Sequence, residues 1–585
     1  MDAEPGFTEE QKQYLEGFLG GVMARHAAQG VPAASSAARG PVDLARVAQD
    51  RVLAAGGTLT PEEQAKRDAE PLDLWDTLRD HAAAGRFPKG IDVFRHKFHG
   101  LFYVAPAQNA FMCRLRMPNG ILAAGQLRGL ADLAERFGGG YADVTTRANL
   151  QVREIAAAHA LDLLTGIQDL GLTSRGSGAD NVRNITGSPT AGIDAEELID
   201  TRPLARELHH HILNHRDLYG LPRKFNIAFD GGGQVAVLED TNDIGFAAVA
   251  VAEGNGVAAG VYFRLQLGGI TGHGDFARDA GVLLRPEQCL PVAVAVLRVF
   301  IAEGDRTDRK RARLKYVLDR LGHERFLAET EKLLSFTLAR LPLDACERRA
   351  PVLKHGHVGI HRQRQAGLSY IGVVLPVGRM TAHQMRGIAD IAHRYGSGTI
   401  RLTVWQNLLI SDVAEADLAA AQAALAVLGL DWRASNIRGA LVACTGNTGC
   451  KFAATDTKGQ ALALAEHLEQ RLALDQPVNI HLTGCPHSCA QHYVGDIGLL
   501  GVKVGEEQLE GYALYVGGGA GSERALARAI YEALPMAEMP RRVEGLLRAY
   551  LACRSDAGES FHAFASRLTP EALRAAGDAA LAGVN

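Results

Sequence analysis

Features that would place this chain at a membrane, on nucleic acid or in a disulfide-rich class are missing. No segment approaches the roughly 18 uninterrupted apolar residues of a membrane-spanning helix. The formal net charge is −4, so there is no excess of positive charge to attract nucleic acid. Eight cysteines in 585 residues are too sparse for a disulfide scaffold. The first residues are acidic and polar, unlike a signal peptide. We expect a cytoplasmic, monomeric globular protein.

A dinucleotide-binding fingerprint is also missing. The glycine-rich segments FDGGGQ (229–234) and YVGGGAGS (515–522) have neither the G-x-G-x-x-G nor the G-x-x-x-x-G-K-S/T spacing. A tight turn is the simplest interpretation of each segment. We therefore expect the chain to draw no electrons from NAD(P)H itself.

Four of the eight cysteines form a compact pattern. Cys444 and Cys450 are spaced C-x5-C, Cys485 and Cys489 are spaced C-x3-C, and 34 residues separate the two pairs. Four thiolates suit zinc, Cu(I) or an iron–sulfur cluster. Structural zinc usually takes pairs with two to four residues between the ligands, so the five-residue gap favours an iron–sulfur cluster. Zinc, and buried or disulfide-bonded cysteines, remain the alternatives.

An internal repeat organises most of the chain. Residues 127–150 align without a gap on residues 385–408, at an offset of 258, and Asp243-Ile-Gly245 has a counterpart in Asp496-Ile-Gly498. A period this long indicates a duplicated domain. The segments predict an α+β protein with pseudo-twofold symmetry. The matched pairs include Arg128/Arg386, Asp132/Asp390, Arg136/Arg394, Gly138/Gly396, Asn149/Asn407, Pro118/Pro376 and Gly120/Gly378.

The two copies differ where polar chemistry is expected. Alternation across 141–153 predicts one polar strand face with Arg147, Asn149 and Gln151 on it. In the second copy Arg147 is replaced by Trp405 and Gln151 by Leu409, whereas the cysteine pattern is present only in that copy. We therefore expect one active site shared between the halves.

The motifs CTGNTGC and TGCPHSCAQ resemble the assimilatory nitrite and sulfite reductase family, whose members carry a siroheme coupled to a [4Fe-4S] cluster. The resemblance implies that Cys444, Cys450, Cys485 and Cys489 hold the cluster, and that Cys489 bridges it to the siroheme iron. It also implies an internally duplicated siroheme/iron–sulfur reductase fold with ferredoxin-like half-domains and an N-terminal helical arm.

Basic residues of the first half form the second part of the expected site. Arginine forks suit oxyanions and carboxylates, although any single arginine is more often a surface residue. By resemblance, Arg114, Arg183 and Lys224 face the substrate, with Asn226 beside them. The cofactor-binding set implied is Arg147, Asn149, Gln151, Arg223, Arg309, Arg313, Lys315 and Cys489.

Asn226 separates two possible substrates. Nitrite reductases of the family carry asparagine at the end of the Lys-Phe-Asn motif (224–226), whereas sulfite reductases carry a second lysine. Nitrite is a monoanion and sulfite can be a dianion, so one fewer cation suits nitrite. The resemblance implies six-electron reduction of nitrite to ammonium, with ferredoxin or a similar one-electron carrier as the donor. The alternatives are sulfite reduction, the related cobalamin-pathway oxygenase, and a non-catalytic scaffold that holds zinc.

The expected domains follow from the repeat and the resemblance. Residues 1–90 form a helical arm and linker, with helices over 8–27 and 61–84 and a loose Ala/Gly/Pro/Ser-rich segment to about 60. The remaining divisions are 91–165 with 350–430 as paired ferredoxin-like half-domains, 166–349 as the siroheme and substrate domain, and 431–575 as the [4Fe-4S] and siroheme domain.

Overall fold

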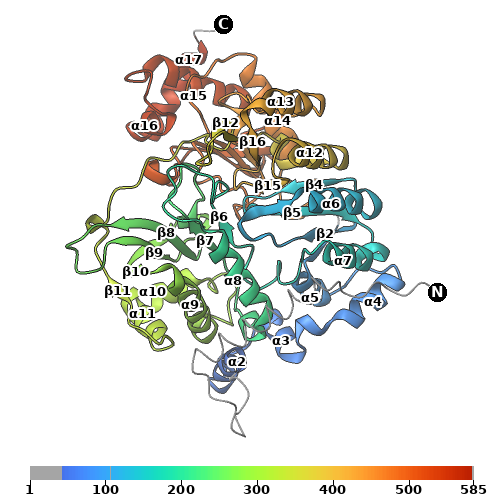
Figure 1. Cartoon of the computed structure of the whole chain (residues 1–585). Coiled ribbons are helices and arrows are strands. Elements are labelled where there is room, and N and C mark those ends of the chain that lie inside the picture. The colour runs from blue at the N-terminus through green and yellow to red at the C-terminus, as the bar shows by residue number, and fades with distance from the viewer. Residues whose placement is uncertain (1–42, 106, 583–585) are drawn as a thin grey trace. The chain divides into compact units, whose positions relative to one another are not determined.

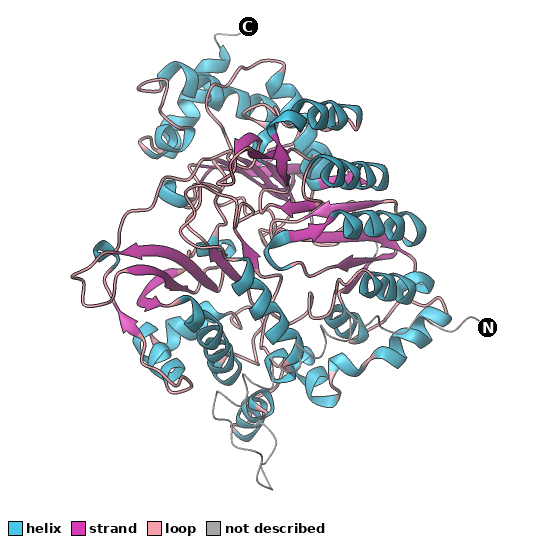
Figure 2. Cartoon of the chain, viewed as in Figure 1, coloured by secondary structure: helices cyan, strands magenta, loops and turns pink. Residues whose placement is uncertain are grey.

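Four β-sheets carry the fold of the described residues, 43–105 and 107–582. In this computed structural model two sheets have the strand orders β1-β2-β5-β4-β14 and β12-β13-β16-β15-β3. The other two have the orders β11-β10-β9-β8-β7-β6 and β17-β18-β19-β20-β21. Figure 2 shows the strands, in magenta, among the covering helices. The sheets form two matched pairs, as an internal duplication requires.

The first pair of sheets exchanges one strand between the copies. Strand β3 (Ile121–Ala123) pairs with β15 of the second copy, and β14 (Arg379–Thr381) pairs with β4 of the first. This reciprocal exchange joins the half-domains about a pseudo-twofold axis. The remaining strands are β1 (Leu101–Val104), β2 (Ala110–Arg114), β4 (Tyr141–Val144) and β5 (Leu150–Ile155), with their counterparts β12 (Gly359–Arg362), β13 (Leu368–Val373), β15 (Thr399–Leu402) and β16 (Leu408–Ala414).

Gly120 and Gly378 lie where the backbones of the two copies approach each other, just before the exchanged strands. Both have positive φ, 68° and 80°. A Cβ on Gly120 would lie 2.8 Å from the carbonyl oxygen of Leu402, and a Cβ on Gly378 would lie 2.7 Å from that of Val144. A larger residue would therefore collide with the other copy at both positions.

Helices α6 (Ala124–Phe137) and α12 (Ala382–Tyr395) lie side by side (Figure 1). Arg128 pairs with Asp390 at 2.5 Å, and Arg386 pairs with Asp132 at 2.8 Å. Since both arginines and both aspartates are repeat counterparts, the contact has the reciprocal form of a twofold interface. The matched charges seen in the sequence therefore join the copies to each other.

The second pair of sheets shares its register at an offset of 253 residues. Ile227 lies opposite Ile244, and Ile480 lies opposite Ile497, in parallel pairs. The six-stranded sheet consists of β6 (Thr186–Gly187), β7 (Ile227–Asp230), β8 (Ile244–Val251), β9 (Gly260–Leu267), β10 (Arg278–Leu284) and β11 (Ala339–Arg340). The five-stranded sheet consists of β17 (Leu441–Ala443), β18 (Ile480–Thr483), β19 (Ile497–Val504), β20 (Leu509–Val516) and β21 (Arg528–Pro535).

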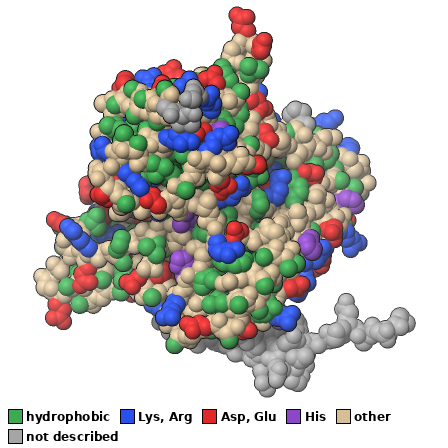
Figure 3. All heavy atoms as spheres, turned by 90° about the horizontal axis from the view of Figure 1, so that it is seen from above, with side chains coloured by type: hydrophobic (Ala, Val, Ile, Leu, Met, Phe, Trp, Pro, Cys, Tyr) green, Lys and Arg blue, Asp and Glu red, His purple; other side chains and the backbone are tan. Residues whose placement is uncertain are grey.

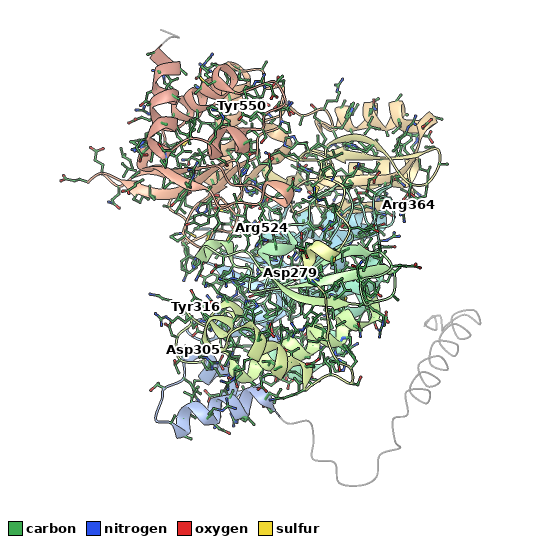
Figure 4. All side chains as sticks on the ribbon, turned by 90° about the vertical axis from the view of Figure 1, so that its left-hand side faces the viewer. Asp279, Asp305, Tyr316, Arg364, Arg524 and Tyr550 are labelled. Atoms are coloured by element: carbon green, nitrogen blue, oxygen red, sulfur yellow. The ribbon has the colours of Figure 1, made fainter. Side chains whose placement is uncertain are left out.

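Helices bury the apolar faces of these sheets. In α9 (Cys289–Glu303) and α15 (Met539–Cys553), most residues are buried against the six-stranded and five-stranded sheets respectively. Arg524, labelled in Figure 4, pairs with Asp240 at 3.1 Å and so links the two copies. Further helices after residue 90 are α5 (Asp92–His96), α7 (Ala160–Asp169), α8 (Arg202–Asn214), α10 (Leu314–Leu321), α11 (His323–Glu331), α13 (Leu418–Val427), α14 (Thr457–Glu469), α16 (Phe561–Ser566) and α17 (Pro570–Ala582).

The expectation of a single polar strand over 141–153 is wrong. The chain forms β4 and β5, joined by a turn in which Ala148 has a φ of 45°. Asp143 lies opposite Gln151 in this hairpin, while Arg147 belongs to the turn. Polar and apolar residues alternate on both sides of the turn, and the sequence pattern therefore resembles that of one continuous strand.

Two N-terminal expectations also need correction. Part of the segment expected to be loose is helix α2 (Leu44–Ala54). Alanine, leucine and arginine, which make up most of this helix, all have high helix propensity. The helix expected over 61–84 is interrupted, giving α3 (Pro61–Asp68) and α4 (Trp75–Ala83), with Pro71 starting a short 3₁₀ turn between them. The helix expected over 8–27 lies outside the described residues.

The surface carries both signs of charge. Figure 3 shows Lys and Arg side chains interspersed with Asp and Glu over one face. None of the helices in the described ranges combines the length and the hydropathy that a bilayer crossing needs.

Candidate active site

Two of the motif cysteines follow neighbouring parallel strands. Cys444 comes directly after β17, and Cys485 comes shortly after β18. The carboxyl ends of these strands meet at one edge of the sheet, which brings the two cysteine loops together. The backbone N–H of Gly484 donates to Cys444 Sγ at 3.2 Å. This hydrogen bond ties one loop to the other.

The four motif thiols share one electrostatic environment. All four are free, with no disulfide between them. Loss of hydration raises the pKa of the Cys485 thiol to about 12, and the thiols of Cys489, Cys444 and Cys450 add to that rise in pKa. The other three thiols therefore lie close enough to Cys485 to influence its charge. Within 43–105 and 107–582, no three His, Cys, Asp or Glu side chains surround a position for a single metal ion.

Cys489 lies at the boundary between the thiols and the basic residues. Thr146, from the β4–β5 turn of the first copy, donates its hydroxyl to the Cys489 carbonyl oxygen at 3.0 Å. Burial and the neighbouring Cys444 raise the pKa of the Cys489 thiol, whereas Lys224 and Arg114 lower that pKa. The side chain nevertheless keeps accessible surface. The two copies therefore meet at this thiol.

Four predicted cations lack a carboxylate partner within the part of the chain that the structure describes. Arg114 lies over the Phe102 ring, 4.5 Å from its centroid. Arg147 donates to Asn242 Oδ1 at 2.7 Å, and Arg183 donates to two carbonyl oxygens at 2.8 and 3.0 Å. For Lys224, no hydrogen bond or ion pair to a described residue is formed. The cations influence one another's charge, and none of the four forms an ion pair with a described carboxylate.

This clustering of like charges perturbs their protonation. Burial lowers the pKa of Arg114 and of Arg147 to about 10, and it lowers the pKa of Arg183 as well. For Lys224, burial and the repulsion from Arg313 lower the pKa to about 7. Lys224 is therefore a cation of the site that can gain or lose a proton near neutral pH.

The other predicted basic residues lie against carboxylates. Asp180 accepts from Arg309 at 2.8 Å and lies 3.8 Å from Arg223. The remaining two pairs are Arg313 with Asp243 at 2.7 Å and Lys315 with Asp275 at 2.6 Å. These four cations are therefore partly neutralised, unlike the four around Cys489.

The predicted amide side chains have different surroundings. Asn149 donates to the Leu115 carbonyl oxygen at 2.5 Å, and Gln151 accepts from Arg153 at 2.6 Å. Asn226 is buried, and its Oδ1 atom has no hydrogen-bond partner among the described residues. Its backbone N–H donates to Asp243 at 2.8 Å. The side chains of Asn149 and Gln151 thus bind other groups of the protein, while the Oδ1 atom of Asn226 has no described partner.

The sequence interpretation missed several residues that shape the site. Asp180 and Asp243 are fully buried carboxylates that accept the predicted cations. Lys458 lies near Asp143 at 3.9 Å, and burial lowers its pKa to about 8. The repeat of Asp243 at Asp496 was visible in the sequence, but their partners come from distant segments. No sequence signal identified Lys458.

Comparison with known proteins agrees with this architecture. The family profile for the nitrite and sulphite reductase 4Fe-4S domain matches residues 178–338 and 434–574. The profile for the nitrite/sulfite reductase ferredoxin-like half domain matches residues 105–170 and 361–428. The fold and the site thus define an internally duplicated reductase in which two half-domains accompany two copies of a larger domain.

Whole-chain relatives narrow this class. The ferredoxin–nitrite reductase of Leptolyngbya laminosa is 37% identical over 514 residues, covering 85% of this chain and 98% of that protein. The chloroplastic ferredoxin–nitrite reductase of Zea mays is 35% identical, covering 84% and 89%. The solved structure of the Mycobacterium tuberculosis NirA protein has a TM-score of 0.81 at 28% identity, covering 89% and 99%. This chain belongs to the nitrite and sulphite reductase family, and the predicted fold and family are confirmed.

Proposed function

We propose that this chain is a ferredoxin-dependent nitrite reductase. The reaction takes six electrons and eight protons and converts nitrite into ammonium and two water molecules. The observation that carries the proposal is the position of Cys489, whose thiol belongs to a four-cysteine set and also lies in the field of Arg114 and Lys224. The names of the Leptolyngbya and maize relatives support both the substrate and the donor.

The residues present fit a [4Fe-4S] cluster and a siroheme. Four free thiols are the donor set of such a cluster, so Cys444, Cys450, Cys485 and Cys489 would hold it. The unbalanced cations suit a macrocycle with many carboxylates. When bound, the two groups would supply an electron path and an iron for the nitrite nitrogen, with Cys489 as their bridge.

The basic residues divide into two proposed roles. Arg147 and Arg223 would bind siroheme carboxylates first, because Arg147 forms no ion pair with a described carboxylate and Arg223 has only the distant one with Asp180, at 3.8 Å. Arg309, Arg313 and Lys315 would join them by exchanging their present carboxylate partners. Asn149 and Gln151 would hold the surrounding backbone and Arg153 in position.

Arg114, Arg183 and Lys224 would bind the nitrite oxygens and stabilise their negative charge. The two arginines remain charged at neutral pH, so they orient the anion. Lys224 would hold a proton on Nζ and release it toward a leaving oxygen, because its pKa lies at about 7. Asn226, whose Oδ1 atom has no described partner, would occupy the position at which a second lysine would favour sulfite.

The test compares both anions on the purified holoprotein. Its visible spectrum should show haem and iron–sulfur absorption that changes on addition of nitrite. With reduced methyl viologen as donor, we expect ammonium formation to exceed sulfide formation, and Cys489→Ser to abolish both. Sulfide in excess of ammonium would identify a sulfite reductase, and a colourless zinc-loaded protein would contradict the enzyme altogether.

A further inference from the structure

Behind Cys489, two buried histidines contact the backbone of the same loop. His481 Nδ1, from β18, lies 2.8 Å from the carbonyl oxygen of Ala490 and 3.2 Å from that of Gln491. Carbonyl oxygens only accept, so Nδ1 carries the proton and donates. His492 Nδ1 forms a hydrogen bond with Ser488 Oγ at 3.1 Å. These contacts hold the residues on both sides of Cys489.

The internal repeat provides a control for what the fold alone requires. Gln491 has a φ of 55°, and its counterpart Leu238 has a φ of 57°, so the left-handed turn there belongs to both copies. Ser488 also has a positive φ, 51°, but its counterpart Val235 does not. A left-handed conformation is unfavourable for a non-glycine residue and persists where its neighbours hold it. The copy with the cysteines therefore adds strain directly before Cys489.

The histidines are likewise found only in the copy with the cysteines. His481 corresponds to Ala228, and its ring packs on Gly495, where an added Cβ would lie 3.0 Å from the ring. The counterpart of Gly495 is the larger Asn242. The first copy thus has alanine and asparagine at the two positions where the second has histidine and glycine. The missing side chain at Gly495 leaves room for the His481 ring.

We propose that His481 and His492 are positioning residues that fix the backbone on either side of Cys489. They thereby hold the Cys489 thiol between the other three motif thiols and the basic residues. The inference rests on the proposed function, because it assigns the loop the task of joining two iron centres. His481 fastens the segment after Cys489, and His492 fastens the strained residue before it. A thiol held at both sides keeps a constant geometry during successive electron transfers.

The test measures coupling between the haem iron and the cluster in the holoprotein, by EPR and Mössbauer spectroscopy. We expect His481→Leu and His492→Phe to weaken this coupling and to lower kcat with reduced methyl viologen about tenfold, with the KM for nitrite unchanged within about twofold. His481→Asn should restore both properties, because the amide Nδ2 is attached at the same atom as Nδ1 and can donate to the same carbonyls.

His357→Phe is the matched control. His357 is buried and stacks on Trp405, 5.5 Å between ring centroids, but its bond goes to Gly439. We expect this variant to lose thermal stability while keeping the coupling. Wild-type coupling in both His481→Leu and His492→Phe would overturn this inference and leave the proposed function standing. If His481→Leu does not fold, the result for His492→Phe decides. A wild-type protein without coupled centres would instead overturn the proposed function.

Discussion

At the scale of single residues, Lys224 makes the clearest electrostatic prediction. Its pKa is about 7 in the folded protein, because burial and Arg313 disfavour the charge, against about 10.4 in an unfolded chain. Between these values the unfolded chain binds one more proton, so the free energy of unfolding rises with pH from about 7 to about 10. Lys224→Met should remove a slope of at most about 1.4 kcal/mol per pH unit.

The measurement is chemical unfolding of the cofactor-free protein between pH 7 and pH 10. Lys224→Met should be more stable than wild type at pH 7, with the difference shrinking toward pH 10. Lys315→Met is the control, because Asp275 and Asp319 outweigh burial and raise the pKa of that lysine. A stability difference independent of pH would show that Lys224 stays charged in the fold.

Asn226 carries a prediction about substrate choice. The residue is buried near Lys224, and its Oδ1 atom has no described partner, so a longer cationic side chain there would add positive charge to the site. Asn226→Lys should shift the ratio of sulfite to nitrite turnover upward by about tenfold, since sulfite can carry the second negative charge. Asn479→Lys, at the repeat counterpart, is the control. An unchanged ratio in Asn226→Lys would exclude this residue from selectivity.

At the scale of elements, helices α6 and α12 give a test of the pseudo-twofold contact. The pair of Arg128 with Asp390 is exposed, so a double-mutant cycle with Arg128→Met and Asp390→Asn should yield a coupling of about 0.5 kcal/mol that fades at high salt. The reciprocal pair of Arg386 with Asp132 should show a salt-sensitive coupling too. Urea unfolding measures both. Coupling at one pair without the other would contradict the reciprocal contact.

The elements also explain where sequence patterns succeeded. The 258-residue offset predicted α6 and α12 as counterparts, and they span 14 residues each. The hairpin of β4 and β5 was missed, because residues on both sides of the turn continue the same alternation. The break at Pro71 between α3 and α4 carried a local signal, but the helical periodicity on either side concealed it.

At the scale of the whole molecule, duplication followed by divergence explains the site. One copy contributes Arg114, Arg147 and Lys224, and the other contributes the cysteines and His481. The strand exchange of β3 and β14 fixes the two copies against each other, so that Thr146 of one copy reaches the Cys489 backbone of the other. Neither half by itself contains both the four motif cysteines and the basic residues proposed to bind the anion.

The sequence by itself determined the family, the duplication and the four thiols, because these depend on residue type and spacing along the chain. Only the tertiary structure decided which cations stand without a carboxylate. Arg309 and Arg313 meet Asp180 and Asp243 from distant segments, while Lys224 meets none and shifts its pKa to about 7. Burial and charge pairing are properties of neighbours in space, and the chain order does not contain them.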